Sequence, residues 1–80
     1  MLDELHKKQL INESRYLTIK GQIYYKERIA GKSTSYKIGH LTGYTPEYVR
    51  LVLGGFMRVT ARNIRILQAI ENTALEYHSV

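Results

Sequence analysis

The sequence predicts a mainly α-helical fold, a compact bundle formed by a single domain of 80 residues. Two observations lead to this prediction. Apolar residues in the C-terminal part recur at intervals of three or four, which is the spacing of one helical face. Six glycines, at positions 21, 31, 39, 43, 54 and 55, divide the rest of the chain into short segments of the kind that tight turns connect in a helical domain.

The clearest element is a long C-terminal helix over about 61–77. Thr60 is placed to cap its start, because a threonine oxygen accepts a hydrogen bond from a free backbone amide of the first turn. One face of the helix is apolar and is formed by Ile64, Leu67, Ile70, Ala74 and Tyr77. This pattern predicts a helix that packs against the core along most of its length.

Two short helices are predicted before it. One spans about 46–53: Thr45 caps it, Pro46 suits its first position, and the glycine pair at 54–55 ends it. Its inward face consists of Val49, Val52 and Leu53. The other spans about 35–42, follows a run of hydroxyl residues that can cap it, and ends at Gly43. Its predicted inward residues are Ile38 and Leu41.

The first 30 residues allow more than one structure. Residues 1–13 are predicted as a weakly ordered or amphipathic segment, with apolar residues at Leu2, Leu5, Leu10 and Ile11. From residue 15 onward, a helical stripe interrupted at Gly21 is formed by Tyr16, Ile19, Ile23 and Ala30, whereas the alternation at 17–20 fits a short β-hairpin near 16–25. We favour a helix over about 22–30, because a helix preceding residue 35 completes a three-helix core.

Composition argues against several classes of function. The chain has no cysteine, and its three histidines lie far apart without metal-ligand spacing, so no metal or other cofactor is predicted. No nucleophile, acid–base pair or phosphate-binding loop has a recognisable context, so an enzyme is not predicted, nor is a small-molecule ligand. No run approaches the ~20 apolar residues that a membrane span requires.

Charge is concentrated in the middle of the chain. The formal net charge is +5, and the stretch from Ser14 to Arg65 holds ten Lys and Arg residues against two acids, Glu27 and Glu47. The residues on either side of this stretch are mildly acidic. A basic patch of this kind is the electrostatic feature expected of a protein that binds a phosphate backbone.

Residues 35–53 carry the most informative pattern, two short helices joined at a turn. Gly39 is small, which allows the second helix to approach closely. Gly43 supplies the positive φ that a tight turn needs, and Tyr44 fills the turn with an apolar ring. Glycine within a helix costs ~1 kcal/mol relative to alanine, so Gly39 is expected to weaken the first helix.

This stretch resembles the helix-turn-helix of the lambda repressor and Cro class, especially small regulators of phages and other mobile elements. The likeness rests on Thr-Gly-Tyr-Thr-Pro-Glu-Tyr-Val at 42–49 and Val-Leu-Gly-Gly at 52–55, and it covers about residues 28–70. It departs from the family at Gly39, where alanine is usual. The resemblance implies a sequence-specific regulator, such as a repressor, that binds double-stranded DNA in the cytoplasm of a bacterial or phage-infected cell.

In the resembled family the second helix enters the major groove, and its N-terminal part contacts bases. The residues expected to do so here are Thr45, Glu47, Tyr48, Arg50 and Leu51. Arg50 is the best candidate, because arginine bonds guanine in bidentate fashion. Tyr48 is also suited to bond a phosphate through its hydroxyl. Flanking phosphate contacts are expected from Lys32, Ser33, Thr34, Ser35, Lys37 and Arg58.

Two further expectations concern partners. A homodimer is predicted, because the core of so short a chain is thin and has no disulfide to brace it. Its predicted interface is the C-terminal helix around Ala74 and Tyr77, with Leu2 and Leu5. The alternative function is a helix-turn-helix module that binds protein, such as an antitoxin or an accessory factor of an excision or replication complex.

Overall fold

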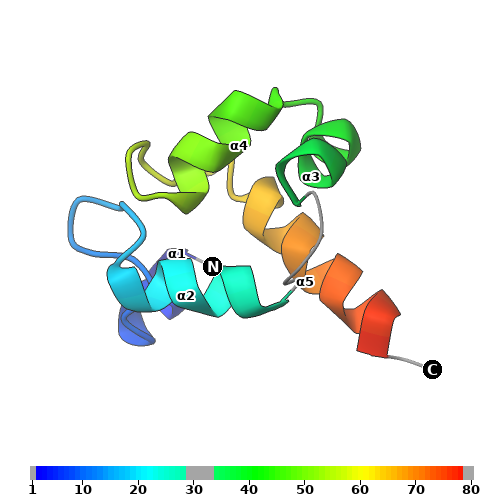
Figure 1. Cartoon of the computed structure of the whole chain (residues 1–80). Coiled ribbons are helices and arrows are strands. Elements are labelled where there is room, and N and C mark those ends of the chain that lie inside the picture. The colour runs from blue at the N-terminus through cyan, green and yellow to red at the C-terminus, as the bar shows by residue number, and fades with distance from the viewer. Residues whose placement is uncertain (1, 29–33, 79–80) are drawn as a thin grey trace.

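The computed structural model describes residues 2–28 and 34–78, with side chains as far as residue 74. Five helices lie within these residues: α1 (Leu2–Lys7), α2 (Ile19–Arg28), α3 (Thr34–Thr42), α4 (Pro46–Leu53) and α5 (Arg65–His78). α3 and α4 lie on one side of α5, with α1 and α2 on the other (Figure 1). The prediction of a mainly helical bundle is confirmed.

No helix in the described part of the chain combines the length and the apolar character needed to cross a membrane.

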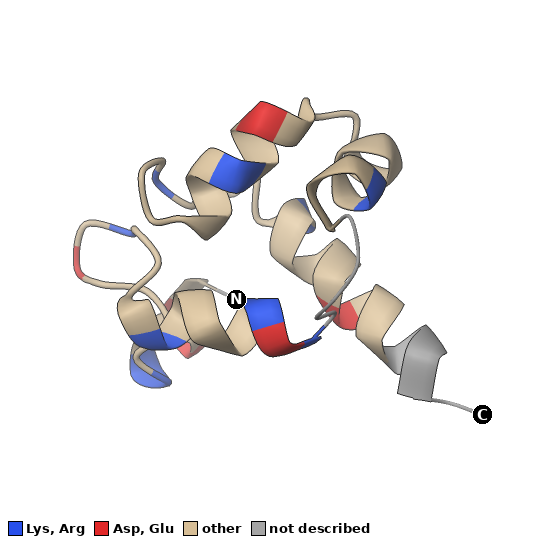
Figure 2. Cartoon of the chain, in the orientation of Figure 1, with Lys and Arg blue, Asp and Glu red and all other residues tan. Residues whose placement is uncertain are grey.

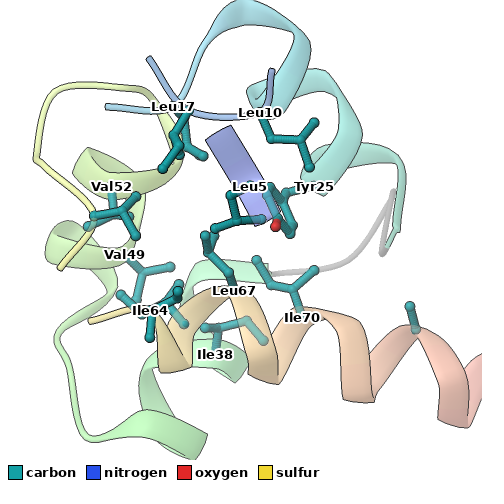
Figure 3. Packing of buried hydrophobic residues seen from close by; sticks show 14 residues of the cluster. Leu5, Leu10, Leu17, Tyr25, Ile38, Val49, Val52, Ile64, Leu67 and Ile70 are labelled. Atoms are coloured by element: carbon teal, nitrogen blue, oxygen red, sulfur yellow. The ribbon is translucent and has the colours of Figure 1, made fainter. Parts of the chain in front are cut away.

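One apolar core joins all five helices. The labelled side chains in Figure 3 converge from α1, α2, α3, α4 and α5 and from the loops between them. Fourteen hydrophobic residues are buried in it: Leu5, Leu10, Ile11, Leu17, Tyr25, Ile38, Val49, Val52, Val59, Ile64, Ile66, Leu67, Ile70 and Ala74. Within this core α4 packs against α3, and α3 in turn packs against α5, which supports the helix pair.

The N-terminal segment contributes to this core. Leu5, Leu10 and Ile11 are buried, and Ile11 pairs with Leu17 in an isolated antiparallel bridge. The backbone amide of Thr18 donates to the carbonyl of Leu10 (3.0 Å). These contacts tie residues 2–18 to the start of α2, so the amphipathic interpretation of this segment is the one that the structure supports.

α2 replaces the alternative hairpin near 16–25, which is not formed. Thr18 caps the helix, since its Oγ1 accepts from the amide of Gly21 (3.0 Å). Gly21 faces inward and lies against the backbone of Leu10, where a side chain would collide with the Leu10 carbonyl. That contact determines which face of α2 is inward, so the predicted stripe through Ile19 and Ile23 is wrong: both side chains are exposed.

α5 starts later than predicted, at Arg65, and residues 61–64 form turns. The expected apolar face is confirmed at Ile64, Leu67, Ile70 and Ala74, whereas the side chain of Tyr77 lies outside the described residues. The predicted dimer surface is wrong at Ala74 and Leu5, because both are buried within the single chain.

α2 and α5 are joined by an ion pair at the surface. Arg28 donates to the Glu71 carboxylate from Nε (3.2 Å) and from Nη2 (2.9 Å), and its guanidinium lies over the ring of Tyr24 (4.7 Å). These hydrogen bonds hold the pKa of the Glu71 carboxyl below its ordinary value. Burial raises the pKa of the Tyr25 hydroxyl beside them.

Candidate nucleic-acid interface

The turn between α3 and α4 has the geometry that its glycines predict. Gly43 has a φ of +83°, and its amide donates to the carbonyl of Gly39 (2.8 Å) to close the end of α3. A Cβ on Gly39 would lie 2.6 Å from the Tyr44 carbonyl oxygen. The expectation that Gly39 allows a close approach is confirmed, because a side chain here would collide with the turn that leads into α4.

α4 begins where the Thr-Pro pair predicts. Thr45 is extended, with φ −69° and ψ 152°, and its Oγ1 accepts from the amide of Tyr48 (3.1 Å). Pro46 follows at the start of the helix, and the observed bounds Pro46–Leu53 confirm the predicted ones. The Thr45 side chain is exposed, although its oxygen is occupied as a cap.

α4 has one buried face and one exposed face. Val49 and Val52 are completely buried, and Leu53 is half-buried, as the pattern predicted. Glu47, Arg50 and Leu51 are exposed. These three side chains give the outer face of α4 an acceptor, a forked donor and an apolar group, which are the three kinds of group that contact base edges.

Tyr48 lies between the two faces. It is half-buried, its ring stacks on Tyr44 with centroids 4.8 Å apart, and Arg65 lies over the Tyr44 ring (5.1 Å). The Tyr48 hydroxyl accepts from Asn63 Nδ2 (3.0 Å). A hydroxyl both donates and accepts, so its own proton is not used by that bond.

Asn63 is a buried residue that sequence reasoning missed. Its Nδ2 donates to the Arg58 carbonyl (2.8 Å) as well as to Tyr48, and its Oδ1 accepts from the amide of Thr60 (2.7 Å). The amide of Asn63 in turn donates to Thr60 Oγ1 (3.1 Å), so the two residues cap each other. The signal was present as a hydroxyl residue followed three positions later by a side-chain acceptor, the spacing of a capping box.

Arg50 has a neighbour on α3 that was not foreseen. Its guanidinium lies 5.9 Å from the centroid of the Tyr36 ring, within the range of a cation–π contact. Tyr36 is exposed, and so is Leu41, which was predicted to face inward. The inward face of α3 is formed by Ile38 and Gly39. Leu41 lies outside the part of the helix circumference that these two residues occupy, so its side chain points outward.

The predicted phosphate contacts are distributed over two segments. Thr34 and Ser35 are half-buried at the start of α3, and Lys37 is exposed one turn later. Arg58 is exposed in the loop after α4, with its guanidinium 5.9 Å from the centroid of the Tyr16 ring. Lys32 and Ser33 lie outside the described residues. Figure 2 shows basic positions on α3, on α4 and in the loop that follows α4.

Among the described residues, no group of three or more His, Cys, Asp or Glu side chains is placed to hold a metal ion.

Comparison with protein-family models, with curated proteins and with solved structures gives no match.

Proposed function

We propose that the protein is a sequence-specific DNA-binding regulator that inserts α4 into the major groove of double-stranded DNA. The observation that carries the proposal is the exposed face of α4, where Glu47, Arg50 and Leu51 project from a helix whose other face is anchored by Val49 and Val52. A helix supported in this way holds its outer side chains in a fixed register against base edges.

The surrounding charges support the same proposal. Two exposed cationic residues flank α4 in the sequence: Lys37 precedes it on α3, and Arg58 follows it in the next loop. Cationic side chains that flank a groove-binding helix contact phosphates, and they contribute affinity without regard to sequence. Such a protein would act by occupying an operator, with no chemistry of its own.

Selection of binding sites from a random DNA pool tests this proposal. We expect enrichment of a short site that contains guanine, since Arg50 is suited to a bidentate contact with that base. A gel shift with the selected site at two salt concentrations should show weaker binding at the higher one. Failure to enrich any sequence, together with no shift at low salt, would contradict the proposal.

The alternative is a helix-turn-helix module whose partner is a protein. It is favoured by Leu41 and Leu51, exposed apolar residues on the two helices. A DNA-binding face tolerates one apolar residue as a contact for a thymine methyl group, whereas a protein partner would need several. The substitution Leu41→Ser separates the two, because it should leave DNA affinity nearly unchanged and should weaken a protein contact.

A further inference from the structure

The Arg50 side chain, on which the proposed base contact depends most, interacts with an aromatic ring of the neighbouring helix. Its guanidinium lies 5.9 Å from the centroid of the Tyr36 ring on α3. Within the described part of the chain, no ion pair involves Arg50, although Glu47 lies one turn earlier on the same helix. The guanidinium of Arg50 is therefore held beside a ring and not by a carboxylate.

The packing of α3 against α4 brings these two side chains together. The helices approach closely at Gly39, where a Cβ would lie 3.4 Å from the backbone nitrogen of Pro46. Tyr36 precedes Gly39 by three positions on α3, and on α4 Arg50 follows Pro46 by four. Residues three or four positions apart share one side of a helix, so the ring and the guanidinium meet one turn away from this approach.

The apolar core does not explain why an aromatic residue stands at position 36. The Tyr36 side chain is 66% exposed, and the inward face of α3 is formed by Ile38 and Gly39. A single exposed aromatic residue is ordinary on a protein surface, but this one lies within the ~6 Å over which a ring attracts a guanidinium. Its position is better explained by the contact with Arg50 than by packing.

An aromatic ring restrains an arginine without occupying its hydrogen-bond donors. The attraction is that of the ring quadrupole for the cation, so it requires none of the guanidinium N–H groups. A carboxylate would occupy those donors, as Glu71 does with Arg28 on the opposite side of α5. The ring of Tyr36 therefore leaves the fork of Arg50 available for the O6 and N7 acceptors of a guanine.

We propose that Tyr36 is a positioning residue, which holds Arg50 ready for its bidentate contact with guanine. This inference rests on the proposed function of α4. A free arginine side chain has many rotamers, and ordering it on binding lowers the affinity. The ring removes part of that freedom before DNA binds. Tyr36 thus increases the affinity for the selected site without contacting DNA itself, and a scrambled duplex without the matching guanine gains much less.

Titration of Tyr36 variants against the selected and scrambled duplexes tests this role. Tyr36→Leu removes the ring and should weaken the selected site by about 2- to 5-fold, as expected for an exposed cation–π contact. Tyr36→Phe keeps the ring and should bind like wild type. The salt slope should not change in either variant, because neither substitution alters a charge. Leu41→Ala, a change of an exposed apolar residue on the same helix, is the matched control and should have no effect.

Two results of this titration would overturn the inference. A leucine variant that binds the selected site like wild type would show that the ring does not assist Arg50. A phenylalanine variant as weak as the leucine variant would assign the effect to the Tyr36 hydroxyl, and so to a hydrogen bond with DNA. Circular dichroism checks that each variant is folded, which the exposure of both substituted side chains leads us to expect.

A double-mutant cycle with Arg50→Ala separates positioning from direct contact. If Tyr36 acts through Arg50, the two effects are not additive, and Tyr36→Leu should cause no further loss of affinity in the Arg50→Ala background. A loss of the same size in both backgrounds would overturn the inference, because the ring would then contact DNA on its own.

NMR of the free protein tests the contact without DNA. The Arg50 Nε–H group should have a higher order parameter in wild type and Tyr36→Phe than in Tyr36→Leu. Equal mobility in all three proteins would overturn the inference, whatever the DNA affinities are. Ordering of Arg50 by the ring in a protein that binds no DNA would instead overturn the proposed function, and with it the role in guanine contact, while leaving the contact between the two side chains in place.

Discussion

At Gly39, helix propensity and packing act in opposite directions. Alanine is favoured over glycine in a helix by ~1 kcal/mol, but a Cβ here would lie 2.6 Å from the Tyr44 carbonyl oxygen. Because that neighbour is backbone, relief requires the turn to move, and overpacking of this kind costs about 1–3 kcal/mol. We predict that Gly39→Ala lowers the melting temperature. The control is His40→Ala on the exposed side of α3. A Gly39→Ala variant that melts at the same temperature as wild type or higher, as the control is expected to do, would contradict this explanation.

Gly43 is constrained by its backbone and has no neighbour within 4 Å of a Cβ. At a φ of +83°, a β-branched residue is strongly disfavoured, so Gly43→Val should destabilise the fold by roughly 1–3 kcal/mol. Asparagine tolerates this conformation better, and Gly43→Asn should cost less. Denaturant unfolding of the two variants checks the order. A valine variant as stable as the asparagine variant would mean that strain at this position is unimportant.

The contact between α2 and α5 should make part of the free energy of unfolding depend on pH. Arg28 holds the pKa of Glu71 below its unfolded-state value of about 4.3. The pair therefore stabilises the fold above that pH, and the contribution is lost as the pH falls through the lower folded-state pKa. We predict that Glu71→Gln melts at a lower temperature than wild type near neutral pH, and that the difference shrinks in acid.

Thermal melts between pH 3 and pH 7 provide this comparison (about the range over which a carboxyl group titrates). Arg28→Gln removes the charged partner, so Glu71→Gln made in that background should show no such pH-dependent difference. A difference for Glu71→Gln that stays constant down to the lowest pH would assign its effect to packing and not to the ion pair.

The elements differ in how far the sequence alone determines them. α4 was predicted with its bounds, because Thr45 and Pro46 act locally and the amide of Tyr48 bonds to the cap. α2 was not, because its inward face is set by the contact of Gly21 with Leu10, residues that only the tertiary fold brings together. At the candidate interface the exposed face of α4 followed from periodicity, whereas Tyr36 beside Arg50 and the hydrogen bonds of Asn63 depend on packing between segments.

At the scale of the whole molecule, two arginines have different proposed tasks. Arg50 lies on the exposed face of α4 and is proposed to contact a base, whereas Arg58 lies in the following loop and is proposed to contact phosphate. A base contact exists only where donor and acceptor match, and a phosphate contact releases a counterion whatever the base. Loss of the Arg58 side chain leaves its carbonyl available to Asn63, so the loop keeps that hydrogen bond.

Titration of Arg50→Ala, Arg50→Lys and Arg58→Ala against the selected duplex and a scrambled duplex at several salt concentrations tests this assignment most directly. Arg50→Ala should weaken the selected site by ~1–3 kcal/mol and relax its preference at one base pair, with a much smaller effect on the scrambled duplex. Arg50→Lys keeps the charge without the bidentate fork and should also lose discrimination. Arg58→Ala should weaken both duplexes alike and lower the salt slope by about one. If Arg50→Ala instead weakens both duplexes equally, as Arg58→Ala does, α4 is not the helix that contacts the bases.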